Sequence, residues 1–189
     1  MPSPLGHSLA GFVIHLCAAG KQPRRQWPTL LLLITLANLP DIDFVVGYFI
    51  GEHGAYHRGP SHSLIVALLI GIVLGGLIGT RTGRYMAPTV LASAAYASHI
   101  VLDMLIGSEL SGTFGLQIFW PLSSERFTLP WSVFRMAADS IIATGPITTL
   151  FSPAILPLVT RELQIMLPVV LVSWFFWRAR IAQRDRADR

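Results

Sequence analysis

Residues 57–79 read HRGPSHSLIVALLIGIVLGGLIG and join two opposite kinds of sequence. Two histidines and an arginine come first, and the run 64–79 that follows carries no charged side chain. Such a run is typical of a helix inside a membrane, where ionisable groups cost several kcal/mol each. The stretch therefore predicts a membrane helix that begins beside a polar, functional site.

Composition extends this prediction to the whole chain. Of its 189 residues, 52% are hydrophobic and 13% are charged, and the mean hydropathy is +0.57, which is too apolar for an ordinary soluble domain. Further apolar runs cover 5–19, 27–50 with a break at Pro40, 86–106 and 133–177. We expect an all-α, polytopic membrane bundle. Because no linker or repeat divides the chain, we expect residues 1–189 to form a single domain.

The basic residues predict how this bundle is oriented. They gather in 21–25, in 81–84 and in the tail 178–189, each time beside an apolar run. The positive-inside rule places these segments on the cytoplasmic side, and it explains the net charge of +4 better than nucleic-acid binding does. The histidine and aspartate motifs then fall on the non-cytoplasmic side.

The C-terminal part has a less regular pattern. An outer loop is expected over 107–132, and a cytoplasmic tail then requires an odd number of crossings. One helix near 163–177 satisfies that requirement. The proline-containing segment 133–160 is expected to form a re-entrant or interfacial hairpin over the site.

Seven side chains are candidate metal ligands, because imidazole and carboxylate together suit zinc, manganese or iron. His99 and Asp103 are four residues apart, so both side chains lie on one face of a helix. The single cysteine, Cys17, excludes a site built from thiolates. The candidates are His7, Asp41, Asp43, His57, His62, His99 and Asp103. The alternative is a structural network of polar side chains without a metal.

Local signals predict where these ligands leave the helices. Pro40 is expected to end a helix capped by Asn38, after which the two aspartates emerge in an extended turn. Between the two histidines of HRGPSH, Gly59 permits a tight bend and Pro60 suits a first helical position. Ser61 is the expected N-cap.

The number of candidates exceeds the three protein ligands of a typical catalytic zinc and predicts a centre of two ions. Two ions stabilise the attacking and leaving oxygens in phosphoester hydrolysis, so we expect that reaction. Arg58, Ser61 and the N-terminus of the following helix would contact the phosphate. Arg126, in the outer loop WPLSSER, is either an anion ligand or an interfacial anchor.

Three other classes of protein use similar residues. A transporter needs polar positions through the full membrane depth, whereas these gather on one side. A haem cytochrome needs facing histidines, such as His15 and His99, and the adjacent carboxylates disfavour it. A scaffold with a structural zinc usually has a closed set of four ligands, often with cysteine. A hydrolase is favoured, with a transporter or a polar-network or structural-metal protein without turnover as the alternative.

The motifs resemble a known family. His7, LPDIDF at 39–44, HRGPSHSL at 57–64, HIVLD at 99–103 and FWPLS at 119–123 are similar to the YdjM-like family of membrane-bound, metal-dependent hydrolases, which is described as inner-membrane-associated and LexA-binding. Order and spacing agree over roughly the first 130 residues. Ser61 stands where the family commonly has Thr, which retains the hydroxyl. A more distant likeness is to zinc-dependent phospholipase C.

The resemblance implies an enzyme of the bacterial inner membrane, and the positive-inside rule places its site on the non-cytoplasmic side and its tail in the cytoplasm. It implies that Asp43 acts as a general base or bridging carboxylate. A site at the membrane surface predicts a phospholipid or lipid-linked phosphate as substrate, with membrane lipids as partners and no direct contact with nucleic acid. A partner protein would rest on the family description alone. The implied metal ligands are Asp41, His57, His62, His99 and Asp103, with His7 as a further ligand.

Overall fold

The computed structural model describes residues 3–20, 26–50, 57–106, 115–134 and 153–187. Throughout these residues the regular structure is helical, and the one strand-like feature is an isolated β-bridge between Leu116 and Phe127. The predicted all-α fold is confirmed.

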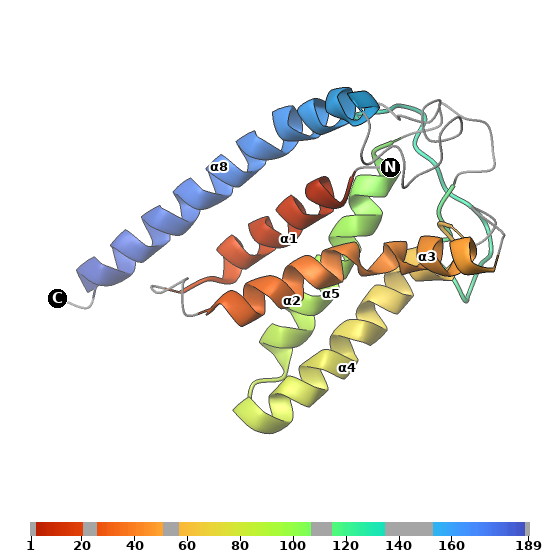
Figure 1. Ribbon diagram of the computed structural model, residues 1–189. Coiled ribbons are helices and arrows are strands. Elements are labelled where there is room, and N and C mark those ends of the chain that lie inside the picture. The colour runs from red at the N-terminus through yellow and green to blue at the C-terminus, as the bar shows by residue number, and fades with distance from the viewer. Residues whose placement is uncertain (1–2, 21–25, 51–56, 107–114, 135–152, 188–189) are drawn as a thin grey trace.

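The long helices form a bundle in which the C-terminal helix is peripheral. α1 (Pro4–Ala18) lies between α2 (Trp27–Asn38) and α8 (Leu156–Ala187), as Figure 1 shows. α5 (Met86–Met104) packs against α1 and α2 on one side and against α4 (Leu64–Thr82) on the other. α5 therefore occupies the centre of the bundle, and its side chains face three neighbours.

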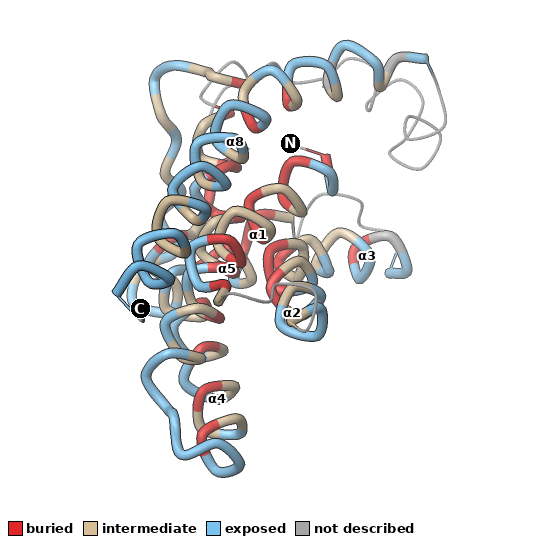
Figure 2. The backbone as a smooth tube through the Cα atoms, turned by 90° about the vertical axis from the view of Figure 1, so that its left-hand side faces the viewer, coloured by how far each residue is buried: buried red, intermediate tan, exposed pale blue. Residues whose placement is uncertain are grey.

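Three segments are long and apolar enough to cross a membrane: Trp27–Gly47, Leu64–Thr82 and Val159–Ala187. α1 is a shorter apolar helix. Large apolar side chains of α4, including Leu68, Ile72 and Leu77, are more than half exposed. Figure 2 shows that buried residues occupy the inward faces of the helices while the outward faces are exposed. An apolar outer surface of this kind is typical of contact with lipid.

The span Trp27–Gly47 bends at Pro40 without leaving helical geometry. α2 ends at Asn38, a 3₁₀ turn η2 covers Leu39–Asp41, and α3 continues over Ile42–Phe49. The predicted extended turn is therefore wrong, and so is the predicted cap. The Asn38 amide instead donates to the Ile34 carbonyl at 2.8 Å and to the Ser8 hydroxyl at 3.1 Å. The reason is that 3₁₀ geometry accommodates the proline ring without breaking the helix.

The short helix η3 (Pro60–His62) precedes α4. Pro60 stands in the first turn of η3, as predicted, but the N-cap of α4 is Ser63, whose hydroxyl accepts from the Ile65 N–H at 3.1 Å. The predicted cap at Ser61 is wrong because that hydroxyl is used elsewhere. The chain bends at Gly59 as expected, and the residue before it, Arg58, has a positive φ of 62°.

Small residues bring α4 and α5 close together. Gly71 and Gly75 face Ser93 and Thr89, and a Cβ added at Gly75 would lie 1.8 Å from the Thr89 hydroxyl. Close backbone approach through small residues is typical of helix packing in membranes. The contact fixes the position of α5, whose C-terminal half carries two of the candidate ligands.

The C-terminal helix is one continuous element. α8 follows the short turn η4 (Pro153–Ile155) and includes the crossing predicted near 163–177. Most of the hairpin predicted for 133–160 lies outside the described residues, and its last residues, from 156 onward, belong to α8 instead. A proline at the first turn of a helix costs no hydrogen bond, so Pro157 does not interrupt it.

Candidate metal centre

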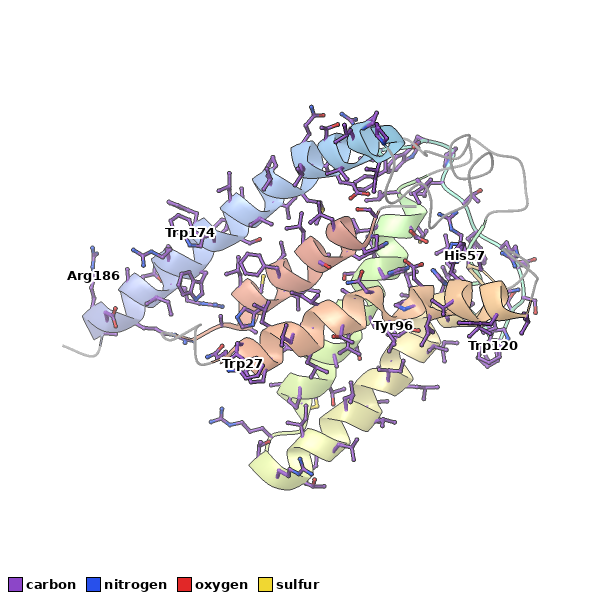
Figure 3. The ribbon with its side chains drawn as sticks, in the orientation of Figure 1. Trp27, His57, Tyr96, Trp120, Trp174 and Arg186 are labelled. Atoms are coloured by element: carbon purple, nitrogen blue, oxygen red, sulfur yellow. The ribbon has the colours of Figure 1, made fainter. Side chains whose placement is uncertain are left out.

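The structure brings all seven candidate ligands together at one end of the bundle. They come from α1, η2, α3, the segment before η3, η3 itself and α5. Three overlapping groups have ligand atoms within 4.8 Å of one another: His7, Asp41 and His99; Asp41, His57 and His62; and His62, His99 and Asp103. Figure 3 shows His57 at this end and Arg186, in the basic tail, at the far end.

Two imidazoles and two carboxylates face a common point. The Nε2 atoms of His62 and His99 lie 3.1 Å apart. Asp41 Oδ1 lies 3.8 Å from the first and 3.4 Å from the second, and Asp103 Oδ2 lies 3.5 and 4.0 Å from them. A tetrahedral ion with bonds of about 2.0–2.2 Å requires its ligand atoms about 3.2–3.6 Å apart. The observed spacings, from 3.1 to 4.0 Å, span that range, so these four atoms lie close enough together to share one ion after small adjustments.

Hydrogen bonds on the opposite ring nitrogens hold two of these imidazoles. His99 Nδ1 lies 2.8 Å from the Ala37 carbonyl, which can only accept, so Nδ1 carries the proton. His62 Nδ1 lies 3.2 Å from Asp43 Oδ2 and 3.0 Å from the Ser61 hydroxyl. A partner on Nδ1 fixes the ring and directs the Nε2 lone pair toward an ion.

Many polar atoms of the cluster are buried without a hydrogen bond. Among the described residues they include both ring nitrogens of His7, His57 Nε2, Asp41 Oδ1 and both carboxylate oxygens of Asp103. Buried polar atoms are nearly always satisfied, because each orphan costs about 1–3 kcal/mol. A cation among these lone pairs would satisfy several of them at once, so the residues fit a divalent metal ion.

His7 joins the cluster from α1. Its ring stacks on that of His99, with centroids 3.8 Å apart and planes 15° apart. Its Nε2 lies 3.8 Å from Asp103 Oδ1. Because the Ser3 hydroxyl caps α1 by accepting from the Leu5 N–H, the first turn that carries His7 is well defined.

Acid–base behaviour of the metal-free cluster follows from its contacts. Burial lowers the pKa of His62, but the neighbouring carboxylates of Asp103 and Asp43 outweigh it and raise that pKa to about 9. At neutral pH the His62 ring is therefore protonated when no ion is bound. An ion bound through His62 Nε2 would have to displace this proton.

The three residues predicted to bind substrate have different surroundings. Arg58 is buried, with its Nε 3.3 Å from Asp103 Oδ2. The Ser61 hydroxyl donates to Asp43 Oδ2 at 2.6 Å. Arg126 is exposed and donates to the Gly115 carbonyl at 2.9 Å. Arg58 and Ser61 thus border the cluster, while a role of Arg126 in substrate binding stays a prediction.

Two supporting residues were not found from the sequence. The Tyr96 hydroxyl donates to the Ser61 carbonyl at 2.8 Å and supports η3. Glu162 of α8, fully buried, accepts from the backbone N–H and the hydroxyl of Ser3 at the start of α1. An acidic residue inside an apolar span is itself a signal, and it could have identified Glu162.

A helical bundle with apolar outer faces and a buried histidine and aspartate cluster defines a membrane protein with a candidate metal centre. The chain belongs to the YdjM inner membrane protein family, whose profile matches residues 1–185. It is 30% identical over 187 residues to inner membrane protein YbcI of Escherichia coli K12, covering 95% of this chain and 100% of YbcI. The predicted family resemblance is confirmed, while the likeness to zinc-dependent phospholipase C has no support. No solved structure matches.

Proposed function

We propose that this protein is a membrane-bound, metal-dependent hydrolase that cleaves a phosphoester of a phospholipid or lipid-linked phosphate. One observation carries the proposal: ring nitrogens of two histidines meet at 3.1 Å between two carboxylates, with most of the surrounding ligand atoms buried. Without a proton or an ion between them these lone pairs would repel one another. Family membership and the apolar spans agree with a membrane-bound enzyme.

The ligand groups support a centre of two ions. Asp41 belongs both to a group with His7 and His99 and to a group with His57 and His62. A carboxylate can bridge two ions, and pairs of ions are typical of phosphoester hydrolysis. The mixture of imidazole and carboxylate favours zinc, with manganese or iron as alternatives.

When bound, such ions polarise a phosphoryl oxygen and lower the pKa of a coordinated water. The residues of the chain supply the remainder of the site. Arg58 places a cation beside Asp103, where a guanidinium can pair with a phosphate oxygen. Asp41 has the most exposed side chain of the seven candidate residues, at 18%, so the substrate would approach on its side.

The location of the cluster favours a lipid substrate. Arg81 lies in the last turn of α4, Arg84 lies in the connection to α5, and Arg178 lies in the C-terminal part of α8. All three are remote from the cluster along these helices, which favours a site on the non-cytoplasmic side. Neighbours of Asp41 on α3, namely Val45, Val46 and Phe49, are at least half exposed and apolar. A substrate with acyl chains could lie along that face while its phosphate reaches the ligands.

Elemental analysis and phosphate release test this proposal. Detergent-purified wild type is expected to hold close to two transition-metal ions per chain and to release phosphate from lipid phosphates. His62→Ala and Asp103→Asn should lose metal and activity, while the exposed Glu125→Gln should keep both. A wild type that holds no metal, and binds none when titrated with zinc or manganese, would exclude the proposal. Metal binding without release from any lipid phosphate would favour a structural metal or transport role.

A further inference from the structure

The carboxylate of Asp43 is not among the atoms that face the candidate ion position. Its Oδ1 lies 3.0 Å from His57 Nδ1, and its Oδ2 lies 3.2 Å from His62 Nδ1. Oδ2 also accepts from the Arg58 N–H at 3.1 Å and from the Ser61 hydroxyl at 2.6 Å. Three of these four contacts fall on Oδ2 and one falls on Oδ1, so both oxygens of the carboxylate accept from donors of the chain.

The two histidines meet Asp43 through the same ring atom. Each presents Nδ1 to one oxygen of the carboxylate, and their ring planes are nearly perpendicular, at 84°, with centroids 5.3 Å apart. An ionised carboxylate only accepts, so it favours the proton on Nδ1 of both rings. The Nε2 atoms of His57 and His62 are then left to bind an ion.

Asp41, two residues earlier, makes the opposite set of contacts. Its Oδ1 has no hydrogen bond among the described residues, and it lies 3.4 Å from His99 Nε2. Residues two apart on a helix project about 200° apart, so the helical backbone of 39–49 directs the two carboxylates to different sides.

We infer that Asp43 is a positioning residue: it orients the imidazoles of His57 and His62 through their Nδ1 atoms and is not itself a ligand. This differs from the general base or bridging carboxylate expected from the sequence, because each of its oxygens already accepts a proton donor. The inference rests on the proposed metal centre. Carboxylates that hold ligand histidines in this way typically change metal affinity by 10- to 100-fold.

Asp43→Asn tests the assignment because an amide has one acceptor oxygen instead of two. One imidazole then loses its acceptor, so zinc affinity measured by competition with a chelator should fall 10- to 100-fold. The number of ions bound at saturation and the visible spectrum of the cobalt-substituted protein should stay as in wild type. Asp41→Asn should lose an ion or change that spectrum, and Glu125→Gln should change nothing.

Each outcome separates the inference from the proposed function. If wild type binds no metal, the metal centre itself fails. If wild type binds metal and Asp43→Asn binds it equally tightly, or loses an ion as Asp41→Asn does, the positioning role is overturned. Should Asp43→Asn not fold, ¹⁵N NMR of histidine-labelled, zinc-loaded wild type decides. Protons on Nδ1 of both His57 and His62 are expected, and a metal-bound Nδ1 on either would overturn the inference.

Discussion

The centre of the bundle and its peripheral helix contribute to the site in different ways. The buried residues of α5 all lie between Ala92 and Asp103, and His99 and Asp103 extend directly into the cluster. α8 offers none of the candidate ligands, and only 6% of the apolar stretch of its span is buried. It contacts α1 near both ends, through Glu162 at Ser3 and Arg180 at the Leu16 and Ala19 carbonyls. The contrast shows that the central helices supply candidate ligands, while α8 holds in place the helix that carries His7.

The largest effect is expected from Asp103→Asn in α5. The change removes a carboxylate charge buried 3.3 Å from Arg58 Nε, which should destabilise the metal-free fold by about 3–5 kcal/mol. Zinc affinity should fall at least 100-fold, because a charged ligand is lost. Chemical unfolding in detergent and chelator competition measure the two effects. Zinc affinity equal to wild type would remove Asp103 from the ligand set.

Packing of α4 on α5 should have the next largest effect. A methyl group at Gly75 would collide with Thr89, so Gly75→Ala should cost about 1–3 kcal/mol of stability. The neighbouring Gly76 has nothing within 4 Å of an added Cβ, so Gly76→Ala is a matched control expected to be neutral or slightly stabilising. Equal thermal unfolding of the two variants would contradict the close contact.

The pH dependence of zinc binding tests the contribution of the central cluster apart from that of α8, because the proton that competes with zinc is on His62. The pKa of His62 is raised to about 9, so below that pH an ion must displace the proton. Zinc affinity should fall about tenfold per pH unit from 9 to 7. Protonation of His62 also stabilises the metal-free fold. This contribution is complete below the pKa that His62 has in the unfolded chain, and it is lost as the pH rises through about 9. Proton release on zinc titration at pH 8, measured with an indicator, tests this, and no release would contradict it.

The smallest effect is expected from α8. Glu162→Gln keeps an acceptor for Ser3 but removes the charge, so stability should fall by about 1 kcal/mol. Zinc affinity should change by no more than about threefold, because Glu162 reaches His7 only through the first turn of α1. Gln164→Ala is the control, because Gln164 is exposed and lies two residues after Glu162 on the same helix. A loss of zinc as large as that of Asp103→Asn would place α8 among the ligand-bearing elements.

Sequence alone determined the class of the protein and the residue types of its site. Hydropathy runs predicted a helical membrane bundle, and the spacing of HIVLD predicted that His99 and Asp103 share a helix face. These are local properties, because a run or a four-residue spacing needs no information about distant parts of the chain.

Tertiary structure decided which atom of each residue faces the candidate ion position. The Nδ1 of His99 is held by the carbonyl of Ala37, 62 residues earlier, and that of His62 by Asp43. The left-handed conformation of Arg58 and the contact of Glu162 with Ser3 likewise depend on partners from other helices. A ring nitrogen takes its role from whatever hydrogen-bonds to the other nitrogen, and only the folded chain brings that partner into contact.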